Sequence, residues 1–275
     1  MNEKPVGAQH VVSSLMRESL IDKDVIARTE APVRAILPHL NVIQIGGSSI
    51  MDRGSKAVLP LLEEIVANQE KHTQVIGVGS GVRARHILSV GLDLGLPTGA
   101  LATLAAKSSA QNAYMVSCLL AKHGFVYLEA PFIVQLLPAI LAAARGAVFN
   151  GIPPYDLWEH PPALGKIPPH GSDAGSYLVA EVFGARTITL LKDVDGLYTA
   201  DPKNHPNAKF IADIHADELI RMQLPALPVE PVVLELLKTA KSVKKMRIVN
   251  GLVPGNLTRA LEDHPDRPVG TLLQA

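Results

Sequence analysis

The sequence predicts an α/β protein with a mostly parallel central sheet and helices on both faces. Apolar runs rich in β-branched residues, at 41–45, 74–78 and 187–191, are typical of strands buried on both faces. Segments with apolar residues at helical spacing alternate with these runs, which is the pattern of βαβ units.

The composition is that of a compact protein with an aliphatic core. Of 275 residues, 47% are hydrophobic and 19% charged, while 26 basic and 26 acidic side chains give a net charge of zero, which argues against nucleic-acid binding. The single cysteine, Cys118, excludes an internal disulfide, and its apolar helical context predicts burial. We find neither a long apolar run nor a signal-peptide pattern, so we expect a cytoplasmic protein without a membrane partner.

The chain begins with a polar, weakly periodic segment. Residues 1–38 are interpreted as an N-terminal arm, either disordered or packed on a partner subunit, with a short helix at 11–20. Residues 39–275 are expected to form the folded domain.

Glycines follow the first two predicted strands. Residues 41–45 lead into Gly46, Gly47 and Ser48, whose successive backbone N–H groups would form an anion nest. Residues 74–78 lead into Gly79 and Gly81, and then into Arg83 on the first turn of a helix, which suits phosphate or another oxyanion. Ordinary tight turns are the alternative interpretation of both loops.

The remaining periodic segments complete the alternation. Pro60 should kink or begin the helix at 52–70, the loop at 91–97 precedes a short apolar piece at 100–104, and Asp173 and Asn256 should cap the helices they begin. Further helices are predicted at 108–124, 136–144, 172–184, 215–222 and 230–240, and further strands at 126–128, 147–150, 246–249 and 271–273.

A proline-rich segment at 151–170 interrupts this regularity. It holds six of the chain's 21 prolines and cannot be a helix or a central strand. Long irregular segments inside a domain are usually functional or lie in interfaces. His160 and His170 within it could bind metal or oxyanions, or be merely solvated.

The loop at 192–202 has the composition of a nucleotide site. Tyr198 offers a ring face for a base, Lys192 a charge for phosphate, and Gly196 a close backbone approach. The loop follows the strand at 187–191, and the carboxyl ends of parallel strands are where open sheets bind ligands. A surface turn is the alternative, because Asp-Gly and Asp-Pro are common turn dipeptides.

These motifs occur in an order that resembles the amino-acid-kinase family, within it the uridylate kinase branch. The resemblance runs from about residue 41 to the end, through the glycine loops, Ser172-Asp173, the loop at 192–202, and residues 249–257 with Gly270-Thr271. It implies a three-layer α/β/α sandwich, with an acceptor-side lobe at about 39–165 and a nucleotide-side lobe at about 166–275.

The resemblance also implies roles for individual residues. Asp173 would organise the phosphoryl-transfer site, and ATP with Mg²⁺ would be the ligand. The family places a lysine where this chain has Gln44, so we expect nucleotide binding without efficient turnover. Residues that would line the phosphate path or hold the adenosine are Gly46, Gly47, Gly81, Lys192, Asp195, Gly196, Tyr198, Asp201, Pro202 and Lys203.

A still closer similarity is to a branch of this family that stores molybdate or tungstate as polyoxometalate clusters. It is carried by residues 79–86, 89–97, 111–112, 153–169 and 249–260. It implies a hexameric cage, of one subunit type or with a histidine-richer sister subunit. Glu129, His160 and His170 would contact the clusters, although a solvated Glu129 is the alternative.

Two other functions remain open on the sequence. A nucleoside monophosphate kinase acting on UMP is one, against which Gln44 argues. A nucleotide-binding scaffold subunit without storage or catalysis is the other.

Overall fold

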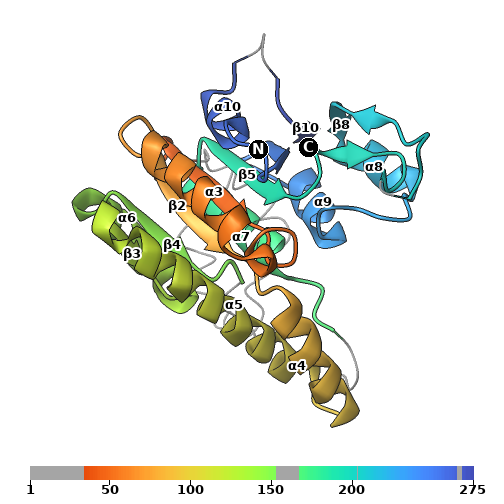
Figure 1. Ribbon diagram of the computed structural model, residues 1–275, viewed down its shortest axis with the longest axis horizontal. Helices are drawn as coiled ribbons and strands as arrows, with labels where there is room; N and C mark the ends of the chain where they lie inside the picture. The colour runs from red at the N-terminus through yellow and green to blue at the C-terminus, as the bar shows by residue number, and fades with distance from the viewer. Residues whose placement is uncertain (1–33, 153–166, 203, 265–267) are drawn as a thin grey trace, which may run out of the picture. The chain divides into compact units, whose positions relative to one another are not determined.

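The computed structural model describes residues 34–152, 167–202, 204–264 and 268–275. The chain divides into two compact units, Met1–Arg34 and Ala35–Ala275. All described helices and strands belong to the second unit, shown in colour in Figure 1. The predicted arm at 1–38 therefore lies almost wholly outside the described residues. Its last part is bound to the domain, since Ile36 N and Leu37 N donate to Phe183 O at 2.9 and 2.8 Å.

An eight-stranded sheet forms the centre of the second unit, in the order β3-β4-β2-β1-β5-β9-β10-β8. β1 pairs in parallel with β2 on one side and with β5 on the other. The carboxyl ends of these three strands therefore lie at the same edge of the sheet. β10 runs antiparallel to β9. The strands are β1 Leu40–Ile45, β2 Thr73–Val78, β3 Phe125–Tyr127, β4 Gly146–Phe149, β5 Thr187–Lys192, β8 Asp213–His215, β9 Lys245–Asn250 and β10 Thr271–Gln274.

Helices cover both faces of the sheet, which confirms the predicted three layers (Figure 1). Successive residues of β1 serve opposite faces: Val42 packs in one core cluster and Ile43 in the other. The first cluster includes α6 Ile133–Ala143, α7 Ser172–Phe183, α8 Ala216–Met222 and α9 Pro231–Lys238, and the second includes α3 Ser55–Asn68, α5 Thr98–Leu120 and α10 Asn256–Glu262. No helix within the described ranges is long and apolar enough to cross a membrane.

The region predicted as a loop, a short apolar piece and a helix is different in the structure. After α4, Val82–Asp93, a single helix of 23 residues, α5, runs from Thr98 to Leu120. Its polar residues do not interrupt it, because Thr103 Oγ1 and Ser108 Oγ donate to carbonyl oxygens four residues earlier. Cys118 lies on an open face of α5 and is exposed, so its predicted burial was wrong.

Helix starts also differ from the prediction. Asp173 and Asn256 were expected to cap α7 and α10, but Gly171 and Gly255 hold the capping positions. Both polar residues lie in the first turn and bond elsewhere. Pro60 lies inside α3, which continues through it. No sequence pattern predicted the hairpin β6 Leu197–Tyr198 with β7 Phe210–Ile211, the strand β8, or three 3₁₀ turns, η2 Met51–Arg53, η3 Ala121–His123 and η4 Ala130–Phe132.

Candidate nucleotide-binding site

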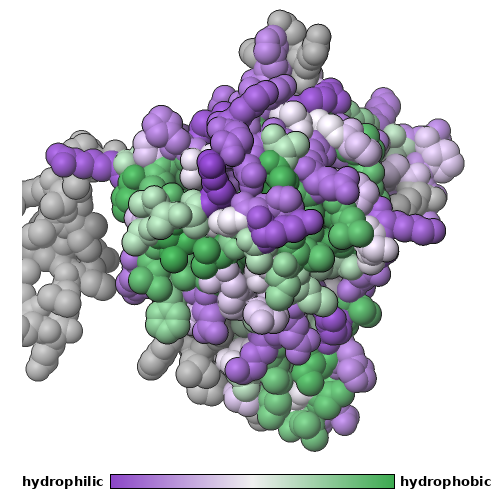
Figure 2. Space-filling view, turned by 60° about the vertical axis from the view of Figure 1, so that its left-hand side comes forward, coloured by the Kyte–Doolittle hydropathy of each residue, from purple (hydrophilic) through white to green (hydrophobic). Residues whose placement is uncertain are grey.

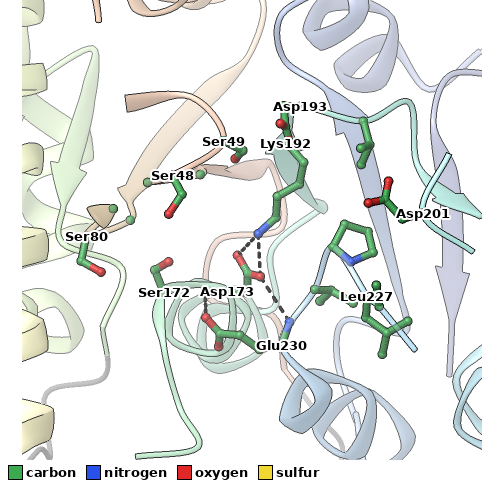
Figure 3. A pocket seen from close by; sticks show the side chains of 18 of the residues that line it. Ser48, Ser49, Ser80, Ser172, Asp173, Lys192, Asp193, Asp201, Leu227 and Glu230 are labelled. Atoms are coloured by element: carbon green, nitrogen blue, oxygen red, sulfur yellow. Dashed lines mark hydrogen bonds and ion pairs between the residues drawn. The ribbon is translucent and has the colours of Figure 1, made fainter. Parts of the chain in front are cut away.

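A cavity of about 670 Å³ opens where β1, β2 and β5 end (Figure 3). This is the edge of the sheet that parallel strands offer to ligands. The structure brings most of the predicted nucleotide-site residues to its walls: Gly46, Gly47, Ser48, Gly79, Gly81, Asp173, Lys192, Gly196, Tyr198, Asp201 and Pro202.

The two glycine loops form one wall by packing backbone against backbone. A Cβ added to Gly47 would lie against Gly81 N, and one added to Gly79 would lie 2.6 Å from Gly47 N. Both positions therefore need glycine because another chain segment passes too close for any side chain. Among the described residues, the backbone N–H groups of Gly47, Ser48, Ser80 and Gly81 meet no protein acceptor. They are available to an anion.

Hydroxyl groups extend this wall. Ser48, Ser80 and Ser172 lie to the left of the cavity in Figure 3, with Asp201 and Leu227 to its right. A phosphate bound against the left wall would meet both N–H and O–H donors, which suits the predicted phosphate path.

A buried ion pair lies between the two walls. Lys192 Nζ, at the end of β5, donates to Asp173 Oδ1 and Oδ2 at 2.8 and 2.7 Å. The side chains are 14% and 4% exposed, so each charge depends on the other to offset its lost hydration. Asp173 comes from the first turn of α7, where the helix dipole also favours a carboxylate.

Glu230 completes the site, although no sequence pattern predicted its role. Its carboxylate accepts hydrogen bonds from Gly171 N, Asp173 N and Ala174 N at 2.9, 3.1 and 3.0 Å. Burial and then the nearby Asp173 carboxylate raise the pKa of Glu230 to about 7, although the three N–H donors act in the opposite direction. In the sequence Glu230 merely precedes Pro231, and nothing there identifies a partner 57 residues away.

The right-hand wall contains the predicted adenosine side. Tyr198, on β6, stacks edge-on against Phe210 with ring centroids 5.4 Å apart. Gly196 lets β6 approach β10, since an added Cβ would lie 2.8 Å from Thr271 N. Asp195 does not line the cavity, and its Oδ1 accepts from Asn250 Nδ2 at 2.8 Å. Lys203 lies outside the described residues.

The predicted oxometalate contacts do not gather at this cavity. Glu129 is exposed beside the end of β3, and His170 is half-buried just before α7. His160 lies outside the described residues. No cluster of three or more histidine, cysteine or acidic side chains that could hold a metal ion occurs in the described part of the chain.

Comparison with known proteins agrees with this architecture. Residues 39–250 match the model of the amino acid kinase family. The chain belongs to the amino acid kinase family. Its sequence is 46% identical over 262 residues to the molybdenum storage protein subunit beta of Azotobacter vinelandii, covering 95% of this chain and 96% of that protein. It is 29% identical over 250 residues to the uridylate kinase of Thermofilum pendens, covering 86% and 98%.

Solved structures show the same fold. The uridylate kinase of Archaeoglobus fulgidus superposes with a TM-score of 0.66 at 20% identity, over 85% of this chain and 99% of that one. The UMP kinase of Bacillus anthracis gives a TM-score of 0.67 at 18% identity, over 86% and 96%. The three-layer sandwich expected for the amino acid kinase family is therefore confirmed.

Gln44, at the position where the resemblance implied a lysine, lies in the core and not in the cavity wall. Its side chain is fully buried on the α7 face of β1. Its Nε2 donates to Ile45 O at 3.0 Å, and its Oε1 accepts from Ser176 Oγ. Gln44 therefore joins β1 to α7 beneath the first glycine loop, and it does not line the cavity.

Arg83 also differs from its predicted position. On α4 it is exposed and does not line the cavity, whereas Arg85 does. The first N–H group of α4 is already bound, since Val82 N donates to Asp52 Oδ2 at 2.6 Å. An internal carboxylate thus occupies the helix start that we expected to bind phosphate.

The Lys192–Asp173 pair gives a stability prediction. Lys192→Met leaves a buried carboxylate unpaired and should lower the free energy of unfolding by about 3–5 kcal/mol. Adding Asp173→Asn should restore part of this loss, with a coupling energy of about 1–3 kcal/mol in urea denaturation. The same cycle on the exposed pair Arg145–Glu70 should show almost no coupling. Additive effects at 173 and 192 would contradict the account.

Proposed function

We propose that this chain is an ATP-binding subunit of an assembly that stores molybdenum or tungsten as polyoxometalate clusters. The observation that carries the proposal is the 46% identity, over 95% of the chain, with a molybdenum storage protein subunit. The uridylate kinases to which the chain is also similar are much less related, at 29% identity or below.

The cavity supports ATP as the ligand. The glycine loops and serines of the left wall suit the phosphates, and Tyr198, Asp201 and Pro202 on the right suit the adenosine. Mg²⁺ usually binds through one or two carboxylates together with substrate phosphates. Asp193 and Asp201 line the cavity and are the carboxylates that would hold Mg²⁺ arriving with the nucleotide, which at Asp193 would compete with the Arg53 guanidinium bound to Oδ2 at 2.6 Å.

The surface supports assembly. Large apolar side chains are exposed on α5, β3, η4 and α6, around the edge strand of the sheet. Figure 2 turns the α6 and β3 side of the molecule forward and shows apolar patches there between polar ones. Such surfaces usually mark protein contacts, here within a hexamer of one or two subunit types. The exposed residues are Tyr114, Met115, Leu119, Val126, Phe132, Val134 and Leu136.

The contacts with the stored clusters are the least defined part of the proposal. Polyoxometalates are anions, so they need N–H, O–H or protonated donors. His160 and His170 offer such groups, and Glu129 could accept from a protonated cluster oxygen. No group of three or more histidine, cysteine or acidic side chains that could hold a metal ion occurs among the described residues, and the proposal includes a sister subunit that supplies further donors.

A UMP kinase is the second candidate, favoured by the structural match to UMP kinases. Gln44 argues against it. Phosphoryl transfer needs positively charged groups in contact with the transferring phosphoryl group, because that group carries negative charge. Gln44 is neutral and directed into the core, and Lys192 is bound by Asp173. A scaffold subunit that binds nucleotide without storage is the third possibility.

Metal uptake tests the storage function. After incubation of the full-length protein with molybdate, Mg²⁺ and ATP, followed by desalting, elemental analysis should find more molybdenum atoms than protein chains. Omitting ATP should lower the content, because the nucleotide site and the store are coupled in this proposal. Less than one molybdenum per chain, both for this chain alone and for the assembly isolated from its own cells, would refute storage.

Substitution of Gln44 tests the argument against turnover. Gln44→Lys introduces a cation below the glycine loop and should raise ADP release, with or without UMP, by about 10-fold or more. Gln44→Met, which removes the same hydrogen bonds without adding charge, is the control and should show no increase. An unchanged rate in a folded Gln44→Lys variant would mean that the missing lysine does not limit turnover.

A further inference from the structure

The segment at 226–230 forms part of the cavity wall. Ala226, Leu227, Pro228 and Val229 line the cavity together with Glu230, immediately before α9. Figure 3 shows Leu227 and Glu230 on this wall, with Glu230 beneath Asp173. The position of Glu230 therefore affects the shape of the cavity.

The contact between Glu230 and α7 is built into the chain. The carboxylate accepts three hydrogen bonds from the backbone N–H groups that begin the helix. Gly171 makes room for it, since an added Cβ would lie against Glu230 Oε1. A helix N-terminus is a general anion site. Here an internal carboxylate fills that site, so these N–H groups are not available to a ligand.

Glu230 also connects to Lys192 through Asp173. Glu230 Oε1 accepts from Asp173 N at 3.1 Å, and Glu230 N lies 3.4 Å from Asp173 Oδ2. The Asp173 carboxylate in turn holds Lys192 Nζ with two hydrogen bonds. Because Asp173 is held at both its backbone and its carboxylate, the orientation of the ion pair depends on Glu230.

We propose that Glu230 is a positioning residue of the nucleotide site, which joins the 226–230 wall to α7 and fixes Asp173 against Lys192. By holding Asp173 against Lys192, Glu230 determines how strongly the lysine charge attracts an anionic ligand in the cavity. The inference rests on the proposed nucleotide binding, so its first test uses no ligand.

The charge of Glu230 adds a pH dependence. The titratable groups around it are Asp173 on α7, Lys192 at the end of β5, and His170 before α7, whose pKa burial lowers. Because the pKa of Glu230 is raised to about 7, the carboxyl is protonated below this pH and ionised above it. The ionised form accepts the three hydrogen bonds more strongly and adds negative charge beside Asp173. Affinity for an anionic ligand should therefore fall as the pH rises through 7.

Acetylation of Lys192 tests the positioning without a ligand. The rate would be measured by peptide mass spectrometry and divided by that of the exposed Lys56. Glu230→Gln should raise this ratio about fivefold, the effect of one lost hydrogen bond. Gly171→Ala, which displaces the carboxylate and leaves its charge intact, should do the same. Glu235→Gln, which removes an exposed carboxylate on α9, is the matched control and should leave the ratio unchanged.

The pH profile separates positioning from general loosening of the fold. From pH 6 to 8 the wild-type Lys192:Lys56 ratio should fall, and in Glu230→Gln it should stay flat. The proposal would be overturned if Glu230→Gln and Gly171→Ala both gave the wild-type Lys192:Lys56 acetylation ratio and the wild-type pH profile of that ratio.

The second test uses ATP. We would measure the ATP dissociation constant of the wild type divided by that of Glu230→Gln. This ratio should rise about threefold or more from pH 6 to 8, a modest charge effect. The titration of ATP itself cancels in this comparison. A constant ratio with measurable binding would overturn the role of Glu230 and leave nucleotide binding intact. Absence of ATP binding would refute the proposed function, while the acetylation result would still decide the positioning of Lys192.

Discussion

The buried pair of Lys192 and Asp173 is the interaction on which the site depends. Lys192 ends β5 and Asp173 begins α7, so the pair joins the sheet to the helix layer where the cavity opens. Neither charge could be buried alone without a large loss of hydration energy. The pair lies between the glycine-loop wall and the wall that carries Tyr198 and Asp201.

Internal carboxylates bind the starts of three helices. Asp52 accepts from the first turn of α4, Glu230 from that of α7, and Glu64 from Thr258 N in α10. The helix starts nearest the cavity are therefore not free for a ligand, and the backbone of the glycine loops supplies the anion donors instead. Two described basic side chains line the cavity: Lys192 is paired with Asp173, which leaves Arg85, while Gln44 is neutral and buried in the core. This arrangement favours holding a nucleotide over transferring its phosphate.

Local patterns in the sequence predicted the layers, most strands and the glycine loops, because burial on both faces and close backbone approach leave local signatures. Long-range contacts could not be predicted in this way. Glu230 reaches its partners across 57 residues, and Asp52 reaches α4 across 30. The position of Gln44 in the sequence indicated that a cation is missing. The direction of the Gln44 side chain, however, depends on its hydrogen bond with Ser176 of α7, which no local pattern reveals. The continuity of α5 was missed because serines that bond back to the helix resemble helix breakers.

The central claim is that this chain holds a nucleotide without consuming it. The most direct measurement is to mix the purified protein with ATP and Mg²⁺, remove free nucleotide by rapid gel filtration, and identify what remains bound after denaturation. The account predicts that nucleotide co-elutes with the protein and is recovered as ATP. Steady conversion to ADP, or elution of the protein without nucleotide, would contradict it.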